Sequence, residues 1–165
     1  MQRDEFFWLS AINKATVVVN RAEGLIGDDT AKLAARGIRA VEEAAAADPA
    51  KRVKTYITYE PLLIEATSPE VTLIHAGRSS QDMLSTVRMA IDRDEALAFA
   101  CAFDAVLEKL IDLAEVHRDT IVPNYTNGVA AQPNSYGHYL LGFIHAFLRE
   151  RERLDQCLAR YDRSS

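Results

Sequence analysis

The sequence has no long hydrophobic run: none approaches the roughly 18 apolar residues that a membrane-spanning helix needs. Its opening, MQRDEFFWLS, lacks the layout of a secretory signal peptide. The net charge of -5 and the pI of about 5.4 argue against a nucleic-acid backbone as the main partner. A local site on an acidic protein can still bind a small anion. We therefore expect a cytoplasmic protein that contacts neither membrane nor nucleic acid.

Cysteine is also scarce. Cys101 and Cys157 are the only two, and neither belongs to a CxxC motif or a Cys/His cluster. Both fall in apolar helical patterns, so we expect reduced, buried thiols without a chemical role. His138 and His145 are seven residues apart, which puts them two helical turns from each other and too far apart to share one metal ion. Glycine-rich phosphate loops and nucleophile elbows are absent as well, and we expect no bound metal.

What is present suits one soluble globular domain: 165 residues, 48% hydrophobic and 26% charged. The apolar pattern predicts a helix over residues 4–26 and a second helix that starts from the N-cap cluster Asp28–Thr30 and ends at Asp48-Pro49. Val53–Tyr59 alternates as a short strand does, whereas the PLLIE that follows has a helical pattern. Both interpretations of that segment stay open.

Two long helices are predicted in the second half. Ser79 or Ser80 caps a helix that runs to about Thr120, some 60 Å at 1.5 Å per residue. The last helix starts near Asn134 or Ser135, and Arg151 is the one break in its apolar stripe. Both carry apolar residues at the 3-4 spacing of a seam for a partner helix: Ala96, Phe99, Phe103, Val106, Leu110 and Leu113 in the first, and Leu140, Ile144, Phe147, Leu154, Leu158 and Tyr161 in the second.

Seams of this length exceed what a compact chain of this size can bury, because its radius of gyration would be only about 15 Å. Much of the apolar surface must then be covered by other subunits or by further chain. The predicted class is all-α, and the predicted architecture is an elongated helical bundle.

Each long helix follows a polar, glycine-bearing segment. Small hydrogen-bonding side chains at a helix N-terminus lie beside unpaired backbone N–H groups and the positive end of the macrodipole. The first segment, Gly77–Asp82, adds one fixed cation, Arg78, to two hydroxyls and the Gln81 amide. Carboxylate binding is therefore one hypothesis. The alternative is ordinary capping by Ser79 or Ser80, which explains everything except the need for both Arg78 and Gln81.

The second segment offers the hydroxyl and amide groups of Thr126, Asn127 and Gln132 in a loop between two prolines and a glycine. A well-made turn explains the same residues, because Asn, Gly and Pro favour turns on their own account. His75 precedes the first segment and has the titration range of a general base, yet a lone histidine is more often structural.

Three blocks, in order, resemble the argininosuccinate lyase branch of the fumarase/aspartase superfamily. YEPLLIE (Tyr59–Glu65) resembles the family helix that ends in LIE, and HAGRSSQD (His75–Asp82) resembles H-T-G-R-S-R-N-D. YTNGVAAQPNSYGHYLL (Tyr125–Leu141) resembles Y-T-H-x-Q-x-A-Q-P-x-x-x-G-H-x-L-L. The resemblance implies a fumarase/aspartase-like homotetramer with a central bundle of very long helices and active sites built from several subunits. It also implies a C–N lyase of arginine biosynthesis that releases fumarate from a succinyl-amine by β-elimination, without a cofactor.

By position, the resemblance makes Ser79, Ser80 and Gln81, together with Arg78, a binding site for a carboxylate of a small dicarboxylate-type substrate. Thr126 would hold the other end of the succinyl group, and Gln132 matches a substrate-contacting glutamine. Thr126 and Asn127 are the candidate catalytic residues, although Asn127 stands where the family has a histidine, and asparagine cannot titrate. The triplet Ser79-Ser80-Gln81 is closer to the S-S-N or T-S-Q of fumarases and adenylosuccinate lyases, so the amine leaving group stays open.

The resemblance makes residues 1–165 the N-terminal part of a lyase, with N-terminal helices in 1–65 and long bundle helices in 75–165. The family's flexible serine loop, thought to carry the catalytic base, would follow residue 165. We therefore expect activity only with the remaining chain or a complementary C-terminal subunit. The alternative is a non-catalytic helical oligomeric subunit, or a truncated product, that retains a carboxylate-binding pocket.

Overall fold

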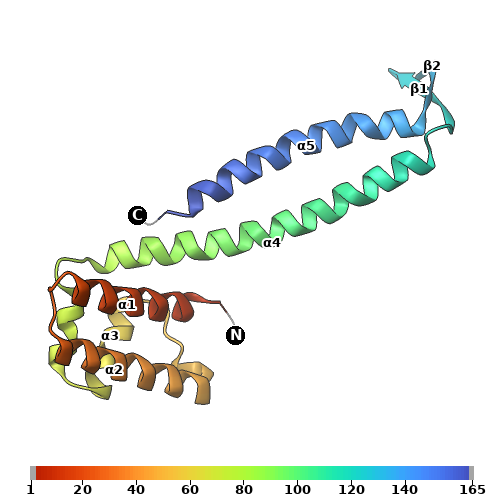
Figure 1. Ribbon diagram of the computed structural model, residues 1–165. Coiled ribbons are helices and arrows are strands. Elements are labelled where there is room, and N and C mark those ends of the chain that lie inside the picture. The colour runs from red at the N-terminus through yellow and green to blue at the C-terminus, as the bar shows by residue number, and fades with distance from the viewer. Residues whose placement is uncertain (1–2, 164–165) are drawn as a thin grey trace. The chain divides into compact units, whose positions relative to one another are not determined.

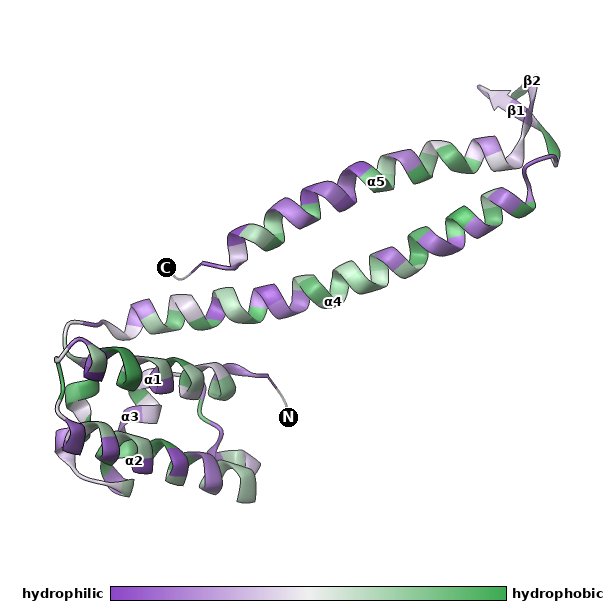
Figure 2. Cartoon of the chain, in the orientation of Figure 1, coloured by the Kyte–Doolittle hydropathy of each residue, from purple (hydrophilic) through white to green (hydrophobic). Residues whose placement is uncertain are grey.

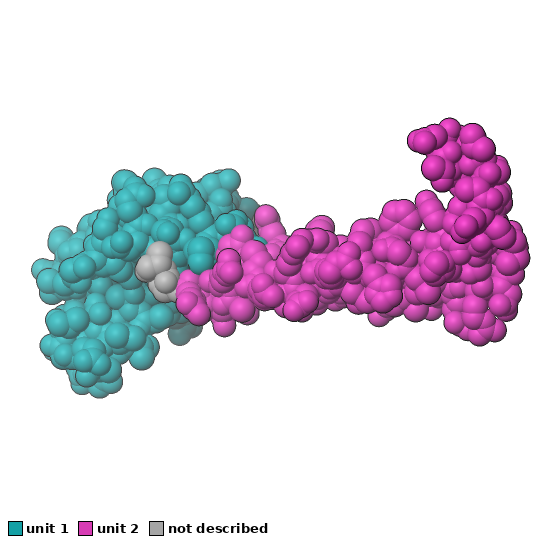
Figure 3. Space-filling model, turned by 90° about the horizontal axis from the view of Figure 1, so that it is seen from above, with its two compact units in different colours: residues 1–92, 164–165 teal, residues 93–163 magenta. Residues whose placement is uncertain are grey.

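The computed structural model describes residues 3–163 and is mainly helical with one small two-stranded sheet, which confirms the predicted class (Figure 1). Hydrophobic and hydrophilic positions are interleaved along the helices (Figure 2). The chain divides into two compact units, residues up to Asp92 and Arg93–Arg163 (Figure 3). In chain order the elements are α1 (Glu5–Ala22), α2 (Asp28–Ala47), the 3-10 helix η1 (Pro49–Lys51), α3 (Tyr56–Ala66), the 3-10 helix η2 (Pro69–His75), α4 (Ser80–Val116), β1 (Ile121–Thr126), β2 (Val129–Ser135) and α5 (Tyr136–Tyr161).

The first two helices begin and end where their local chemistry dictates. Asp4 caps α1, since its carboxylate accepts a hydrogen bond from the Phe7 amide at 3.0 Å. The chain leaves α1 through Gly24, whose φ of 71° lies in the left-handed region that favours glycine. The cap of α2 is Gly27 rather than the predicted Asp28–Thr30 cluster. The carboxylates at the start of that cluster lie inside the first turn, where they complement the helix dipole.

The ambiguous segment Val53–Tyr59 leads into a helix, α3. Its buried residues Tyr56, Tyr59 and Leu63 follow the 3-4 spacing of one helical face. The alternating pattern does not form a strand, because the apolar positions after Tyr59 continue at helical spacing and one face of the helix is buried.

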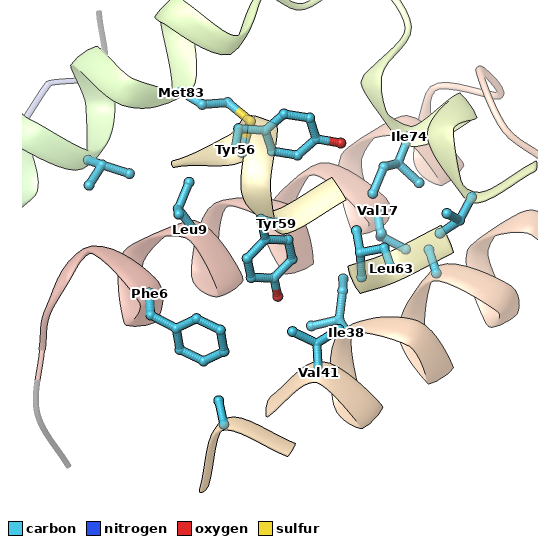
Figure 4. Close-up of a cluster of buried hydrophobic side chains, with 14 of the residues drawn as sticks. Phe6, Leu9, Val17, Ile38, Val41, Tyr56, Tyr59, Leu63, Ile74 and Met83 are labelled. Atoms are coloured by element: carbon cyan, nitrogen blue, oxygen red, sulfur yellow. The ribbon is translucent and has the colours of Figure 1, made fainter. Parts of the chain in front are cut away.

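The core of the first unit forms where side chains of α1, α2, α3, η2 and the start of α4 meet (Figure 4). Tyr59 and Leu63 are both fully buried. The Tyr59 hydroxyl lies 2.9 Å from the hydroxyl of Ser10, itself 1% exposed, so this buried polar pair is satisfied. Burial raises the pKa of Tyr59 to about 12, so its hydroxyl stays protonated at neutral pH.

In the second unit α4 packs against α5 through Phe103 and Leu110 of the predicted seam and through the residues beside them. The buried residues of α4 are Ala100, Leu107 and Ala114, seven apart, with Phe103 and Leu110 half-buried between them. The predicted seam residues Phe99, Val106 and Leu113 lie one position earlier and are 59%, 52% and 38% exposed. Their predicted contact with other subunits stays a prediction. Because α4 is apolar on more than one face, periodicity alone does not select the face that α5 covers.

The predicted stripe of α5 is confirmed. Leu140 and Ile144 are buried against Leu107 and Ala114, and the remaining stripe residues are half-buried. Part of the apolar surface that the sequence assigns to other subunits is therefore covered within the chain.

The break in the α5 stripe has a structural explanation. The Arg151 guanidinium lies 2.6 Å from the carboxylate of Asp104 on α4 and also pairs with Asp155 one turn later. A charged residue is tolerated in the stripe because it is paired across the two helices.

The cysteine prediction was wrong in one respect. Cys101 and Cys157 are free thiols, as expected, but both are exposed, because they lie on the sides of α4 and α5 that face away from the shared stripe. In the described part of the chain, no helix has the length and apolar character needed to cross a membrane.

Candidate functional site

The start of α4 is a reciprocal cap. The Ser79 hydroxyl oxygen accepts a hydrogen bond from the Gln81 amide at 3.1 Å, and the Ser79 amide donates to the Asp82 carboxylate at 2.9 Å. Ser79 is therefore the N-cap, and Ser80 is the first helical residue. Capping by Ser79, the alternative interpretation of this segment, is confirmed.

Capping leaves hydrogen-bond donors available. The Ser79 oxygen accepts from the helix while its own O–H remains free to donate. Within residues 3–163, no hydrogen bond engages the Ser80 hydroxyl or the Gln81 side-chain amide. Three side-chain donors thus lie at the positive end of a 37-residue helix, and Ser79 and Gln81 are exposed. This arrangement is able to bind a carboxylate.

Arg78, by contrast, contacts the chain itself. Its Nη1 donates to the Thr16 hydroxyl, and its Nη2 lies 3.3 Å from the Asn13 side-chain oxygen and 2.9 Å from His75 Nε2. The guanidinium is half-buried, and in the described part of the chain no carboxylate forms an ion pair with it. Burial lowers the pKa of Arg78 from its ordinary value, yet an arginine stays charged at any relevant pH. Two of its side-chain partners, Thr16 and Asn13, are neutral, and the third, His75, is able to be neutral.

His75 is held as a neutral acceptor. Burial, helped by the charge of Arg78, lowers the pKa of His75 to about 3. Its ring lies against that of Tyr56, with 3.6 Å between the centroids, and the Tyr56 hydroxyl donates to Glu60 at 3.1 Å. With so low a pKa the imidazole is a poor general base, so the structural role weighed for this histidine is the better explanation of its position.

A cleft of about 540 Å³ adjoins this region of the first unit. Its polar lining comes from Thr16 and Asn20 of α1 and from Arg78, Asp82 and Thr86 at the start of α4. The Asn20 side-chain amide donates to the backbone carbonyl of Ile74 at 3.0 Å and so fastens η2 to α1. Apolar side chains cover the rest of the wall.

The second predicted segment is a β-hairpin rather than a loop. Thr126 pairs with Val129, which leaves Asn127 and Gly128 as a two-residue turn, and their φ angles are 51° and 78°. Positive φ at both positions is the signature of a type I′ turn, for which Asn-Gly is the preferred sequence. The Asn-Gly pair between two β-branched residues was the available sequence signal for this hairpin. The sequence analysis considered the segment only as a loop and missed the hairpin.

Thr126 and Gln132 are exposed on this hairpin. Between the pairs Pro123–Pro133 and Tyr125–Ala130 the second strand has one residue more than the first, so a bulge places Ala131 and Gln132 opposite Asn124. Bulges of this kind redirect side chains and are common next to active sites.

Sequence reasoning also missed a network at the start of α5. The Ser135 hydroxyl caps the helix by accepting from the His138 amide at 3.1 Å. The Asn134 side-chain oxygen accepts from the Ser135 amide at 2.9 Å and lies 2.7 Å from His138 Nδ1. The Asn134 contact fixes the proton on Nδ1 and leaves Nε2 of the exposed imidazole free. The four-residue spacing of Asn134 and His138 at a helix start was the available signal.

The structure thus gathers the predicted site residues into two groups. Arg78, Ser79, Ser80 and Gln81 share the start of α4 in the first unit, and Thr126, Asn127 and Gln132 share the hairpin of the second. Among residues 3–163, no group of three or more His, Cys, Asp or Glu side chains is placed to hold a metal ion.

Comparison with known proteins decides the family. Residues 2–165 match the family model described as lyase. The chain belongs to the lyase family. Argininosuccinate lyase 1 of Shouchella clausii (strain KSM-K16) is 31% identical over 167 residues, which cover 98% of this chain and 33% of that protein. The argininosuccinate lyase of Carboxydothermus hydrogenoformans (strain ATCC BAA-161 / DSM 6008 / Z-2901) is 36% identical over 66% of this chain and 24% of its own length.

Solved structures agree with this assignment. A crystal structure of EDDS lyase in complex with formate superposes with a TM-score of 0.86 at 29% identity, over 95% of this chain and 31% of that one. A fumarate lyase from Mesorhizobium sp. BNC1 shares the fold, with a TM-score of 0.80 at 19% identity over 98% of this chain and 39% of its own. The predicted likeness to argininosuccinate lyases and the fumarase/aspartase-like fold are confirmed. The chain spans about a third of the length of the first relatives it matches.

Proposed function

We propose that this chain is the N-terminal part of an argininosuccinate lyase-like C–N lyase, which eliminates an amine from a succinyl-amine substrate and releases fumarate. The observation that carries the proposal is the capped start of α4. Ser79, Ser80 and Gln81 present side-chain donors beside the backbone N–H groups of the first helical turn. The similarity to curated argininosuccinate lyases over nearly the whole chain supports the reaction class.

In the proposed reaction a base removes a proton from the carbon next to one substrate carboxylate, and the electrons of that C–H bond pass into the carboxylate. The carboxylate thereby becomes an aci-carboxylate with two negative charges. Those electrons then form the carbon–carbon double bond of fumarate while the C–N bond breaks and the amine takes up a proton. Donors already aimed at the developing charge need no reorganisation during the reaction, and removing one such donor from an enzyme typically lowers kcat by about 10²–10³.

The two groups of residues have different parts in this proposal. Ser79, Ser80 and Gln81 bind a carboxylate, while Thr126 and Gln132 of the hairpin hold the succinyl group. Asn127 orients substrate without transferring a proton, because its amide does not titrate. Since His75 is a poor base, proton abstraction falls to a residue of the remaining protein or of a complementary subunit. The reaction needs no cofactor.

Self-association is part of the proposal. The exposed apolar residues of α4 and α5 include Phe99, Val106, Leu141 and Phe143. A helix that is apolar on several faces is normally buried on several faces, and in a homotetramer of long helices other subunits would cover these residues. Multi-angle light scattering should therefore find an oligomer, and a monodisperse monomer would contradict this part of the proposal. A cytoplasmic location and a place in arginine biosynthesis complete it.

Carboxylate binding is tested with the chain itself and with succinate as the probe. Succinate titrated into the isotopically labelled chain should shift the backbone amide resonances of Ser80 and Gln81. The double variant Ser80→Ala/Gln81→Ala should lose this response, whereas Ser85→Ala, further along the same helix, should retain it. Equal shifts in all three proteins would refute the carboxylate site.

Turnover is tested separately. The chain alone should release no fumarate from argininosuccinate, because the two groups of residues contain no adequate base. Fumarate formation by the purified chain, followed by its ultraviolet absorbance, would overturn that assignment.

A further inference from the structure

The environment of Arg78 is unusual for an arginine at a proposed anion site. A guanidinium that binds substrate carboxylate is expected to present its planar edge to the ligand. Here the two terminal nitrogens already contact Thr16, Asn13 and His75. Asn13 is fully buried, and both Asn13 and Thr16 belong to α1, more than sixty residues earlier in the chain.

The backbone beside Arg78 forms a tight turn. Gly77 has a φ of 75°, and the Arg78 amide donates to the His75 carbonyl at 3.1 Å, so the chain reverses between η2 and α4 in a tight turn. The Arg78 Cα is adjacent to that of Ser79, the N-cap. Fixing the guanidinium on α1 therefore restricts where the first turn of α4 begins.

We propose that Arg78 is a positioning residue: its guanidinium ties the turn that precedes Ser79, Ser80 and Gln81 to Asn13 and Thr16 of α1, and His75 holds the guanidinium in place. This inference rests on the proposed function and reassigns Arg78 from carboxylate ligand to support. Lysine would not replace it, because a single ammonium cannot reach three separated acceptors as a planar fork does.

His75 completes the support by staying neutral. An imidazolium beside the guanidinium would place two cations together and remove the acceptor that Arg78 uses. The groups that face this pair are Tyr56 with Glu60 from α3 and Asp82 from α4. A depressed pKa of His75 agrees with this geometry.

The decisive experiment examines the chain before any ligand is added. In Arg78→Ala the resonances of the Ser79, Ser80 and Gln81 amides should move. Hydrogen exchange at the Met83 amide, which donates to the Ser79 carbonyl, should accelerate by roughly tenfold or more. Free guanidinium ion at low millimolar concentration should fill the vacated space and reverse both changes. If Arg78 instead bound the substrate carboxylate directly, Arg78→Ala would weaken succinate binding and leave the free chain unchanged. That result would overturn the proposal.

Matched variants separate positioning from general stability. Arg52→Ala removes another half-buried arginine of the first unit, one that pairs with Asp4 at 2.5 Å. It should leave the Ser79–Gln81 amides in place and show no guanidinium rescue. Thr16→Val removes one acceptor with little change in shape and should shift the same amides, while Thr16→Ser should not. The two Thr16 variants keep the test decisive if Arg78→Ala does not fold.

Failure of this inference is distinguishable from failure of the proposed function. If succinate does not bind the unsubstituted chain, the carboxylate site is refuted, and the amide measurements still decide what Arg78 does. If succinate binds and Arg78→Ala leaves the free-chain amides unchanged, the site stands and the positioning role is refuted. The His75 ring resonances give an independent readout, because its pKa should rise in Arg78→Ala.

Discussion

Gly137→Ala offers the most direct test of how α4 meets α5. A Cβ at Gly137 would lie 2.5 Å from the backbone carbonyl oxygen of Ala114 and 3.0 Å from the Arg118 Cα. Both obstacles are backbone atoms, so no side-chain rotation relieves the overlap. The Gly137 amide also donates to the His117 carbonyl at 2.9 Å, which holds the two chain segments at this separation.

Overpacking of this kind typically costs about 1–3 kcal/mol. Alanine in a helix gains up to about 1 kcal/mol over glycine, which offsets part of that cost. We expect Gly137→Ala to lower the free energy of unfolding by about 1–2 kcal/mol, or a Tm lower by roughly 2–8 °C at the usual scaling for a chain of this size.

The control is Gly142→Ala in the same helix, where a Cβ would meet no atom within 4 Å. It should leave the Tm unchanged or raise it, because only the helix propensity changes. Thermal unfolding of both variants, followed by circular dichroism, makes the comparison. If Gly137→Ala proved as stable as Gly142→Ala, the close approach of α4 and α5 at this point would be refuted.

Three further predictions concern single side chains. The folded pKa of His75, about 3, lies below its unfolded value of 6.5, so its contribution to stability is complete above pH 6.5 and is lost as the pH falls toward 3. His75→Gln should therefore flatten the dependence of the unfolding free energy on pH in that window, and an unchanged slope would contradict the assignment. Arg151→Met should shift the urea midpoint less than Gly137→Ala does, because the partners Asp104 and Asp155 are largely solvated. Asn127→Val should disrupt the hairpin amide resonances, since a β-branched residue at φ 51° costs about 1–2 kcal/mol, while Asn127→His should preserve them because histidine tolerates this region better; equal effects would refute the turn assignment.

The features predicted best from the sequence were the caps of α4 and α5 and the apolar stripe of α5. On α5 the predicted stripe, broken at Arg151, is the side that packs against α4, and Ser135 was a recognisable cap, so both the start and this buried face were predicted correctly. Ser79 could likewise be predicted at the start of α4, because a hydroxyl followed three residues later by a carboxylate is the pattern of a reciprocal cap.

Where a segment satisfied two patterns, the sequence alone did not select between them. On α4 both the Phe99–Val106 stripe and the Ala100–Leu107 stripe repeat every seven residues, and only packing against α5 decides which lies inside. The exposure of Cys101 has the same cause, since an apolar neighbourhood in sequence need not be a buried one in space. The side-chain donors at the start of α4 could be predicted from the sequence, but not the direction of Arg78, which depends on Thr16 and Asn13 more than sixty residues away.

Capping explains neither Arg78 nor Gln81, and the two side chains differ in what they contact. Gln81 follows the cap on an exposed turn, and within residues 3–163 nothing engages its side chain, so its donors are available to a ligand. Arg78 precedes the cap at a left-handed turn, where a long side chain is able to reach back to α1. A cation used in this way contributes no direct hydrogen bond to a substrate, yet it fixes the backbone from which Ser79, Ser80 and Gln81 project. Preorganised neutral donors at a helix start suit a carboxylate whose charge increases during reaction, because they bind it without the desolvation cost of a second buried charge.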